Sequence, residues 1–194
     1  MLLTVGFSLL AQACSQSPFD TSFGKVVPII AADKASQFFT ADMFSNGDLL
    51  AAGWTQGLLG LPTGGGSDYL LQRYQTDGTL AWTKILISST GNDVRNATKV
   101  GSNDSVYAVG YTFSGAFDGH PVVALNDASI AKFDSAGKTI FSGAFGGDQN
   151  DHANGLALDE ARGIFYVVGD TGSTSFIGHP RIGDFDGFLL LVSS

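Results

Sequence analysis

Short apolar stretches separated by glycine, aspartate and asparagine recur along most of the chain. Such runs, bounded by turn-forming residues, predict β-strands joined by tight turns. The strands expected from this pattern are residues 25–30, 36–44, 48–54, 69–75, 79–87, 95–100, 105–111, 128–134, 138–145, 153–159, 164–170 and 186–193.

Both faces of these predicted strands are apolar. Val106 and Ala108 point to one face of their strand, whereas Tyr107 and Val109 point to the other. A strand that is apolar on both sides must be covered on both sides. We therefore expect sheets that stack face to face.

The strands belong to a unit that repeats along the chain. Asp68, Asp127 and Asp186 follow one another at steps of 59 residues, and each begins a similar segment. The same step relates further positions, among them Gly60, Gly119 and Gly178; Pro62, Pro121 and Pro180; Trp82 and Phe141; and Gly110 and Gly169. A fixed period of this length is typical of repeat architectures.

One stretch is ambiguous. Residues 29–45 contain neither glycine nor proline and could form a helix by propensity. The register of the repeat instead favours a loop followed by a strand.

The repeat resembles a known group. Its motif reads Ala131-Lys132-Phe133-Asp134-Ser135-Ala136-Gly137 after Asp127, then Gly146-Gly147-Asp148 and Asp151, Gly155-Leu156-Ala157-Leu158-Asp159 and Tyr166-Val167-Val168-Gly169. This is similar to the SBBP-type β-propeller repeats of secreted bacterial and archaeal surface proteins. The resemblance implies an all-β fold, a β-propeller-like array of about three four-stranded antiparallel blades. A β-prism-like fold of three sheets is the alternative.

The number of blades raises a question of closure. Residues 186–193 supply the first strand of a blade, which the first unit lacks, so the units add up to three blades. Closed propellers have about four to eight blades. The repeat domain, residues 18–194, is therefore expected to be half of a homodimeric ring or part of a larger surface protein.

The N-terminus is typical of an export signal. Residues 1–13 are nearly all apolar or small, too few to span a bilayer, and precede Cys14. The segment from Leu10 to Cys14 resembles a bacterial lipobox, which implies lipid attachment at Cys14. Residues 1–17 are then expected to be a signal peptide and tether. The protein is expected to be exported to the cell envelope or outer surface, either lipid-anchored or secreted. The lipid would be its only contact with the membrane.

Composition narrows the range of partners. The net charge is −8 and the ten basic residues form no run, so nucleic acid is not an expected partner. Asp and Asn in residues 147–151 and 91–93 offer oxygen atoms to Ca²⁺, but turn formation explains them, and we expect no metal and no cofactor.

No catalytic constellation stands out, and we do not expect an enzyme. The favoured hypothesis is a binding or scaffold module at the cell surface, with a protein or glycan ligand contacted by loop residues on the rim: Phe113, Phe117, His120, Phe176 and His179. A propeller-class carbohydrate-active enzyme is the alternative. It would require polar residues that break the repeat, namely His152, Glu160, Arg162 and Arg181, to converge.

Overall fold

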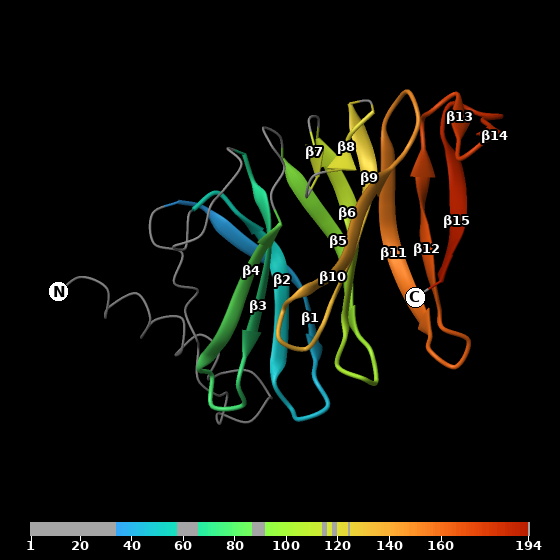
Figure 1. Cartoon of the computed structure of the whole chain (residues 1–194). Helices are drawn as coiled ribbons and strands as arrows, with labels where there is room; N and C mark the ends of the chain where they lie inside the picture. Colours follow the sequence, from blue (N-terminus) through green and yellow to red (C-terminus); the bar gives the residue numbers. More distant parts are fainter. Residues whose placement is uncertain are drawn as a thin grey trace, which may run out of the picture.

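The fold was obtained as a computed structural model, which describes residues 34–57, 66–86, 92–113, 116–117, 120–123 and 125–193. These residues form β-strands and contain no helix, so the all-β prediction is confirmed. The longer strands make three antiparallel sheets that stand side by side, and we number these sheets in chain order (Figure 1).

Sheets 1 and 2 each have four strands in the part of the chain that the structure describes, and sheet 3 has three. Sheet 1 contains β1 (Ser36–Met43), β2 (Leu49–Thr55), β3 (Asp68–Tyr74) and β4 (Leu80–Leu86). Sheet 2 contains β5 (Asp93–Val100), β6 (Val106–Phe113), β9 (Asn126–Phe133) and β10 (Thr139–Phe145). Sheet 3 contains β11 (Asp151–Asp159), β12 (Ile164–Thr171) and β15 (Asp186–Ser193).

The observed strands agree with the expected ones to within about two residues at each end. Within the ambiguous stretch, Ser36–Met43 forms the strand β1, as the repeat register predicted, whereas residues 29–33 lie outside the described residues. The expected strand 25–30 lies outside the described residues. Two short hairpins were not expected: β7 (Ala116–Phe117) with β8 (His120–Pro121), and β13 (Ser175–Phe176) with β14 (His179–Pro180).

Sheet 2 is buried on both faces, as its sequence pattern predicted. Val106 and Ala108 belong to an apolar core shared with sheet 1, whereas Tyr107 and Val109 belong to a second core shared with sheet 3. The first strands of the sheets come together, since β5 lies against β1 and β11 lies against β5. Each sheet is therefore held by the faces of its neighbours.

Turns at one end of the molecule link one sheet to the next. The Ser45 N–H and hydroxyl donate to the Asp104 carboxylate at 2.7 and 2.8 Å, joining the β1–β2 turn to the β5–β6 turn. The Ser102 N–H donates to Glu160 at 2.8 Å, which joins the β5–β6 turn to the β11–β12 turn. Equivalent turns thus carry equivalent contacts.

The first strand of every sheet contains a β-bulge. The ladder registers skip Phe39 in β1, Asn96 in β5 and Asn154 in β11. In sheet 3, a glycine of the next strand, Gly169, lies close to the bulge. A Cβ at this position would be only 2.0 Å from the His152 carbonyl oxygen, so a larger residue would not fit without a shift. The bulges turn these three side chains out of the regular ladder.

Candidate binding site at the free edge of sheet 3

The outer edge of sheet 3 differs from that of the other two sheets. In sheets 1 and 2 a fourth strand, β4 or β10, pairs with the third strand. Among the described residues, no strand pairs with the corresponding side of β15. The backbone N–H and C=O groups on that side are available to another strand.

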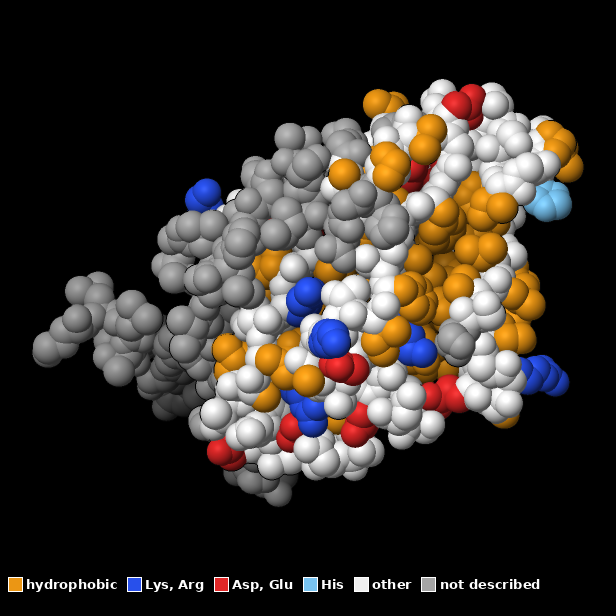
Figure 2. All heavy atoms as spheres, in the orientation of Figure 1, with side chains coloured by type: hydrophobic (Ala, Val, Ile, Leu, Met, Phe, Trp, Pro, Cys, Tyr) orange, Lys and Arg blue, Asp and Glu red, His pale blue; other side chains and the backbone are white. Residues whose placement is uncertain are grey.

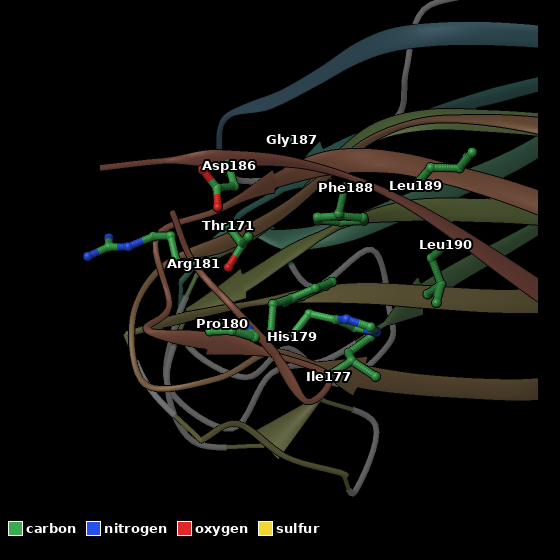
Figure 3. A pocket seen from close by; sticks show the side chains of 11 residues that line it. Thr171, Ile177, His179, Pro180, Arg181, Asp186, Gly187, Phe188, Leu189 and Leu190 are labelled. Carbon is green, nitrogen blue, oxygen red and sulfur yellow. The ribbon is translucent and has the colours of Figure 1, made fainter. Parts of the chain in front are cut away.

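A hollow of about 340 Å³ lies along this free edge, under the β13–β14 hairpin (Figure 3). Side chains of both faces of β15, Phe188 and Leu189, line it together with His179 and Pro180 of β14. The lining is mainly apolar, and Arg181 and Asp186 stand at one end. The hollow thus suits an apolar, extended segment more than a highly charged ligand.

The face of sheet 3 turned away from sheet 2 is apolar and uncovered. Val168 and Leu189 are 47% and 62% exposed, whereas their repeat equivalents in sheet 2, Val109 and Ile130, are 0% and 8% exposed. Sheet 3 itself covers the equivalents in sheet 2. Apolar side chains accordingly gather at the surface over sheet 3 (Figure 2). Clustered exposed apolar residues mark interaction surfaces.

The hairpin above the hollow is held by packing and by hydrogen bonds. The Phe176 ring stacks on Phe188 with centroids 4.5 Å apart. Arg181 donates to the carbonyl oxygens of Gly172 and Asp184, both at 2.6 Å. The N–H groups of Ile182 and Gly183 donate to Asp186 and lower the pKa of that carboxyl group. The rim of the hollow is therefore tied to sheet 3 at several points.

The bulges create a second polar feature between sheets 2 and 3. The Asn96 side-chain amide donates to the Ala153 carbonyl and to Asn154 Oδ1, at 2.9 and 3.0 Å. Asn154 in turn donates to Asp170, whose other oxygen lies 2.9 Å from His152 Nδ1. We call Asn96, His152, Asn154 and Asp170 the bulge cluster.

The polar residues that break the repeat do not converge. His152 lies in the bulge cluster, whereas Glu160 accepts the Ser102 N–H. Arg162 pairs with Asp159 at 3.0 Å, and Arg181 holds the rim of the hollow. Asp170 is the one carboxylate in the bulge cluster, and the two carboxyl groups that glycoside hydrolysis requires are not brought together there.

The rim residues expected to touch a ligand take different positions. Phe117 and Phe176 are buried in β7 and β13 and anchor the two hairpins. Phe113 is half-buried, with its ring centroid 5.6 Å from that of Tyr111. His179 is exposed and lines the hollow, and His120 pairs with Phe117, although its side chain lies outside the described part. Cys14 also lies outside the described residues.

The acidic segment that offers oxygen atoms to Ca²⁺ is used for loop capping. Asp148 accepts the Thr174 N–H and hydroxyl, and Asp151 accepts the Gly147 N–H at 2.8 Å and the Ser173 hydroxyl. Over the described ranges, no three His, Cys, Asp or Glu side chains are grouped closely enough to bind a metal. Nor do these ranges contain a helix long and apolar enough to cross a membrane.

The incomplete last blade was expected from the sequence, whereas the bulge cluster was not anticipated. The only available signal for the cluster was the spacing of 58 residues between Asn96 and Asn154. Comparison with known proteins adds no assignment, because the sequence matches no family model and no curated protein.

Proposed function

We propose that the protein is an exported binding and scaffold module of the SBBP-type β-propeller class, and that the free edge of sheet 3 is its binding surface. The single observation that carries this proposal is the free side of β15, with its hollow and uncovered apolar face. Exposed edges recruit β-strands from partners through backbone hydrogen bonds, while pockets select side chains.

Stacking of the sheets favours blades of a propeller over the walls of a prism. In a prism, each sheet has one face inward and one face to solvent, whereas sheet 2 is buried on both faces. The approach of β1, β5 and β11 also fits the inner strands of successive blades. Blades stacked in this way form a rigid support for their edges and loops.

The proposed location rests on the N-terminal sequence. Residues 1–13 and Cys14 resemble a bacterial lipoprotein signal, and lipidation of Cys14 would tether the module to the membrane. Residues 15–17 would then separate the anchor from the repeat domain.

A non-catalytic role fits the polar groups better than the alternative of a carbohydrate-active enzyme. The bulge cluster contains one carboxylate, and its hydrogen bonds join β5 to β11 and β11 to β12. These contacts hold the strands at the bulges. A protein or glycan ligand at the edge requires no reacting group.

The test is labelling of intact producing cells with a membrane-impermeant maleimide. Ile182→Cys places a thiol on a rim residue that is 97% exposed, and Phe165→Cys is the matched buried control at 1%. We expect Ile182→Cys to be labelled, Phe165→Cys to be protected, and Cys14→Ser to abolish incorporation of labelled palmitate. Labelling of Ile182→Cys only after lysis would contradict export.

A further inference from the structure

The hollow beside β15 corresponds to a position that a strand fills in sheet 2. There β10 pairs with β9 and also lies against β8 of the short hairpin. The repeat equivalents of β9 and β8 are β15 and β14, which line the hollow. The hollow is therefore the space of a fourth strand.

A segment near the N-terminus has the sequence of such a strand. Residues 23–27 read Phe-Gly-Lys-Val-Val, and one repeat step later residues 82–86 of β4 read Trp-Thr-Lys-Ile-Leu. One step further, residues 141–145 of β10 read Phe-Ser-Gly-Ala-Phe. An aromatic residue begins each segment, and each ends in two apolar residues.

The connectivity of the chain shows to which sheet this segment belongs. The fourth strand of a sheet always leads into the first strand of the next sheet: β4 of sheet 1 is followed by β5, and β10 of sheet 2 is followed by β11. Residues 23–27 precede β1, the first strand of sheet 1. By the same order, a strand at residues 23–27 would be the fourth strand of a sheet in front of sheet 1, on the side away from sheet 2.

We propose that this sheet is sheet 3 of a second copy of the chain. Residues 23–27 of each copy pair antiparallel with β15 of the other, so that two copies close into a ring of six sheets. Six lies within the range of closed propellers, and the two identical contacts supply the fourth strand that each sheet 3 lacks. This inference rests on the proposed function, because it names the partner of the same surface.

The register of the new pairing follows from sheets 1 and 2 independently. In sheet 1 Leu71 lies opposite Lys84, and in sheet 2 Ile130 lies opposite Gly143. Shifted by the repeat, both pairs place Leu189 opposite Lys25. The neighbouring pairs, Leu70 with Ile85 and Ser129 with Ala144, both place Phe188 opposite Val26.

The outer face of sheet 3 and the outer face of sheet 1, which would meet in the dimer, both have exposed apolar side chains. Val168 and Leu189 are exposed on sheet 3. On the face of sheet 1 turned away from sheet 2, Leu49 and Leu80 lie opposite Tyr74 and are 41% and 42% exposed. Other residues of that face, such as Leu70 and Ile85, are buried within the single chain. The second copy therefore contacts sheet 1 around Leu49 and Leu80.

A disulfide tests the pairing directly. The full chain with Cys14→Ser, Lys25→Cys and Leu189→Cys is oxidised and run on a non-reducing gel. Directly opposite strand residues are close enough for a disulfide, so we expect a covalent dimer in which the thiol introduced at position 25 of one copy is bonded to the thiol introduced at position 189 of the other. The matched control carries Phe188→Cys in place of Leu189→Cys. Because residue 188 points to the other face of the sheet, we expect this variant to form no disulfide and to run as a single chain on the gel.

Three results of this experiment would overturn the inference. They are the absence of a disulfide, a disulfide within one chain, and a dimer from Leu189→Cys alone, which would mean that two copies of sheet 3 meet face to face. Mass spectrometry of the cross-linked peptide distinguishes these outcomes.

Sedimentation velocity provides an independent measurement on the Cys14→Ser chain. We expect a dimer that Val26→Pro dissociates, with the dissociation constant raised at least about 100-fold because proline cannot pair within a sheet. Ala32→Pro, outside the pairing segment, should remain dimeric, and circular dichroism should show all variants folded. A monomeric Cys14→Ser chain would refute the second copy but leave the proposed function standing if Ile182→Cys is labelled on cells.

Discussion

Two neighbouring valines on one strand of sheet 3 test whether its two faces are in different environments. Val167 is fully buried against sheet 2, whereas Val168 points to the open face and is 47% exposed. Substituting each by alanine removes the same atoms from the same strand. Both variants also carry Val26→Pro, so that association through the open face does not contribute.

The expected difference follows from burial. Removing two buried carbon groups costs about 1.6 kcal/mol in transfer free energy, plus a cavity contribution, so Val167→Ala should cost about 2–3 kcal/mol. Val168→Ala removes groups that are half in water and should cost about 1 kcal/mol or less. The lower strand propensity of alanine affects both variants and largely cancels in the comparison.

The assay is unfolding in urea, followed by far-ultraviolet circular dichroism. With a urea dependence of about 2 kcal/mol/M, a difference of about 1.5 kcal/mol separates the two midpoints by about 0.7 M. Trp54 and Trp82, both in sheet 1, provide a second signal, which should change less if sheet 3 unfolds separately. Equal midpoints for the two variants would refute the conclusion that the Val168 face of sheet 3 is uncovered.

Three further predictions concern the bulges, the turns and acid. Gly169→Ala should lower the free energy of unfolding by about 1–3 kcal/mol, because the new Cβ would meet the His152 carbonyl oxygen. Gly143→Ala in β10, where a Cβ would have no atom within 4 Å, should be neutral or slightly stabilising. Thermal unfolding of the two variants measures this difference. Glu160→Ala should lower the free energy of unfolding by about 0.5–1.5 kcal/mol in urea titrations, because the Ser102 N–H loses its acceptor. Glu160→Gln keeps an acceptor oxygen and should lose less. An equal loss in both variants would contradict the role of Glu160 as hydrogen-bond acceptor. Hydrogen bonds from Ser45 to Asp104 and from Thr174 to Asp148, first from the N–H and then from the hydroxyl, lower the pKa values of these two carboxyl groups. The stabilisation that they contribute is therefore complete above about pH 4 and is lost as the pH falls through the lowered pKa values. Asp104→Asn should flatten the loss of stability in acid, and an unchanged acid profile would exclude this linkage.

The sheets could be predicted because they follow from local chemistry. Apolar residues on both faces of β6 and β9 require cover on both sides, and the 59-residue spacing of Asp68, Asp127 and Asp186 places the strands. The same spacing resolved the ambiguous stretch in favour of β1. These signals identify the strands but not their place in a sheet, because Asp186–Ser193, expected as the first strand of a blade, is the third strand of sheet 3.

The site could not be predicted, because it depends on contacts between units. Asn96 meets Asn154 only after sheets 2 and 3 stack, and the free side of β15 becomes visible only once the strand partners are known. The hairpins have two-residue strands, too short for an alternating pattern. For the same reason the sequence did not show that Phe117 and Phe176 are buried in these hairpins, or that Phe176 also lines the hollow.

The repeat also bears on the proposal that the ligand of the hollow is a strand. Small-molecule sites combine an apolar lining with a few precisely placed polar groups. In the hollow, the charged side chain that departs from the repeat, Arg181, is already bonded to the carbonyl oxygens of Gly172 and Asp184. The hollow instead presents Phe176, His179 and Pro180, which recur one repeat earlier as Phe117, His120 and Pro121 beside an occupied strand position. What distinguishes the hollow is the absence of a paired strand among the described residues, and this agrees with the proposal that a β-strand is its ligand.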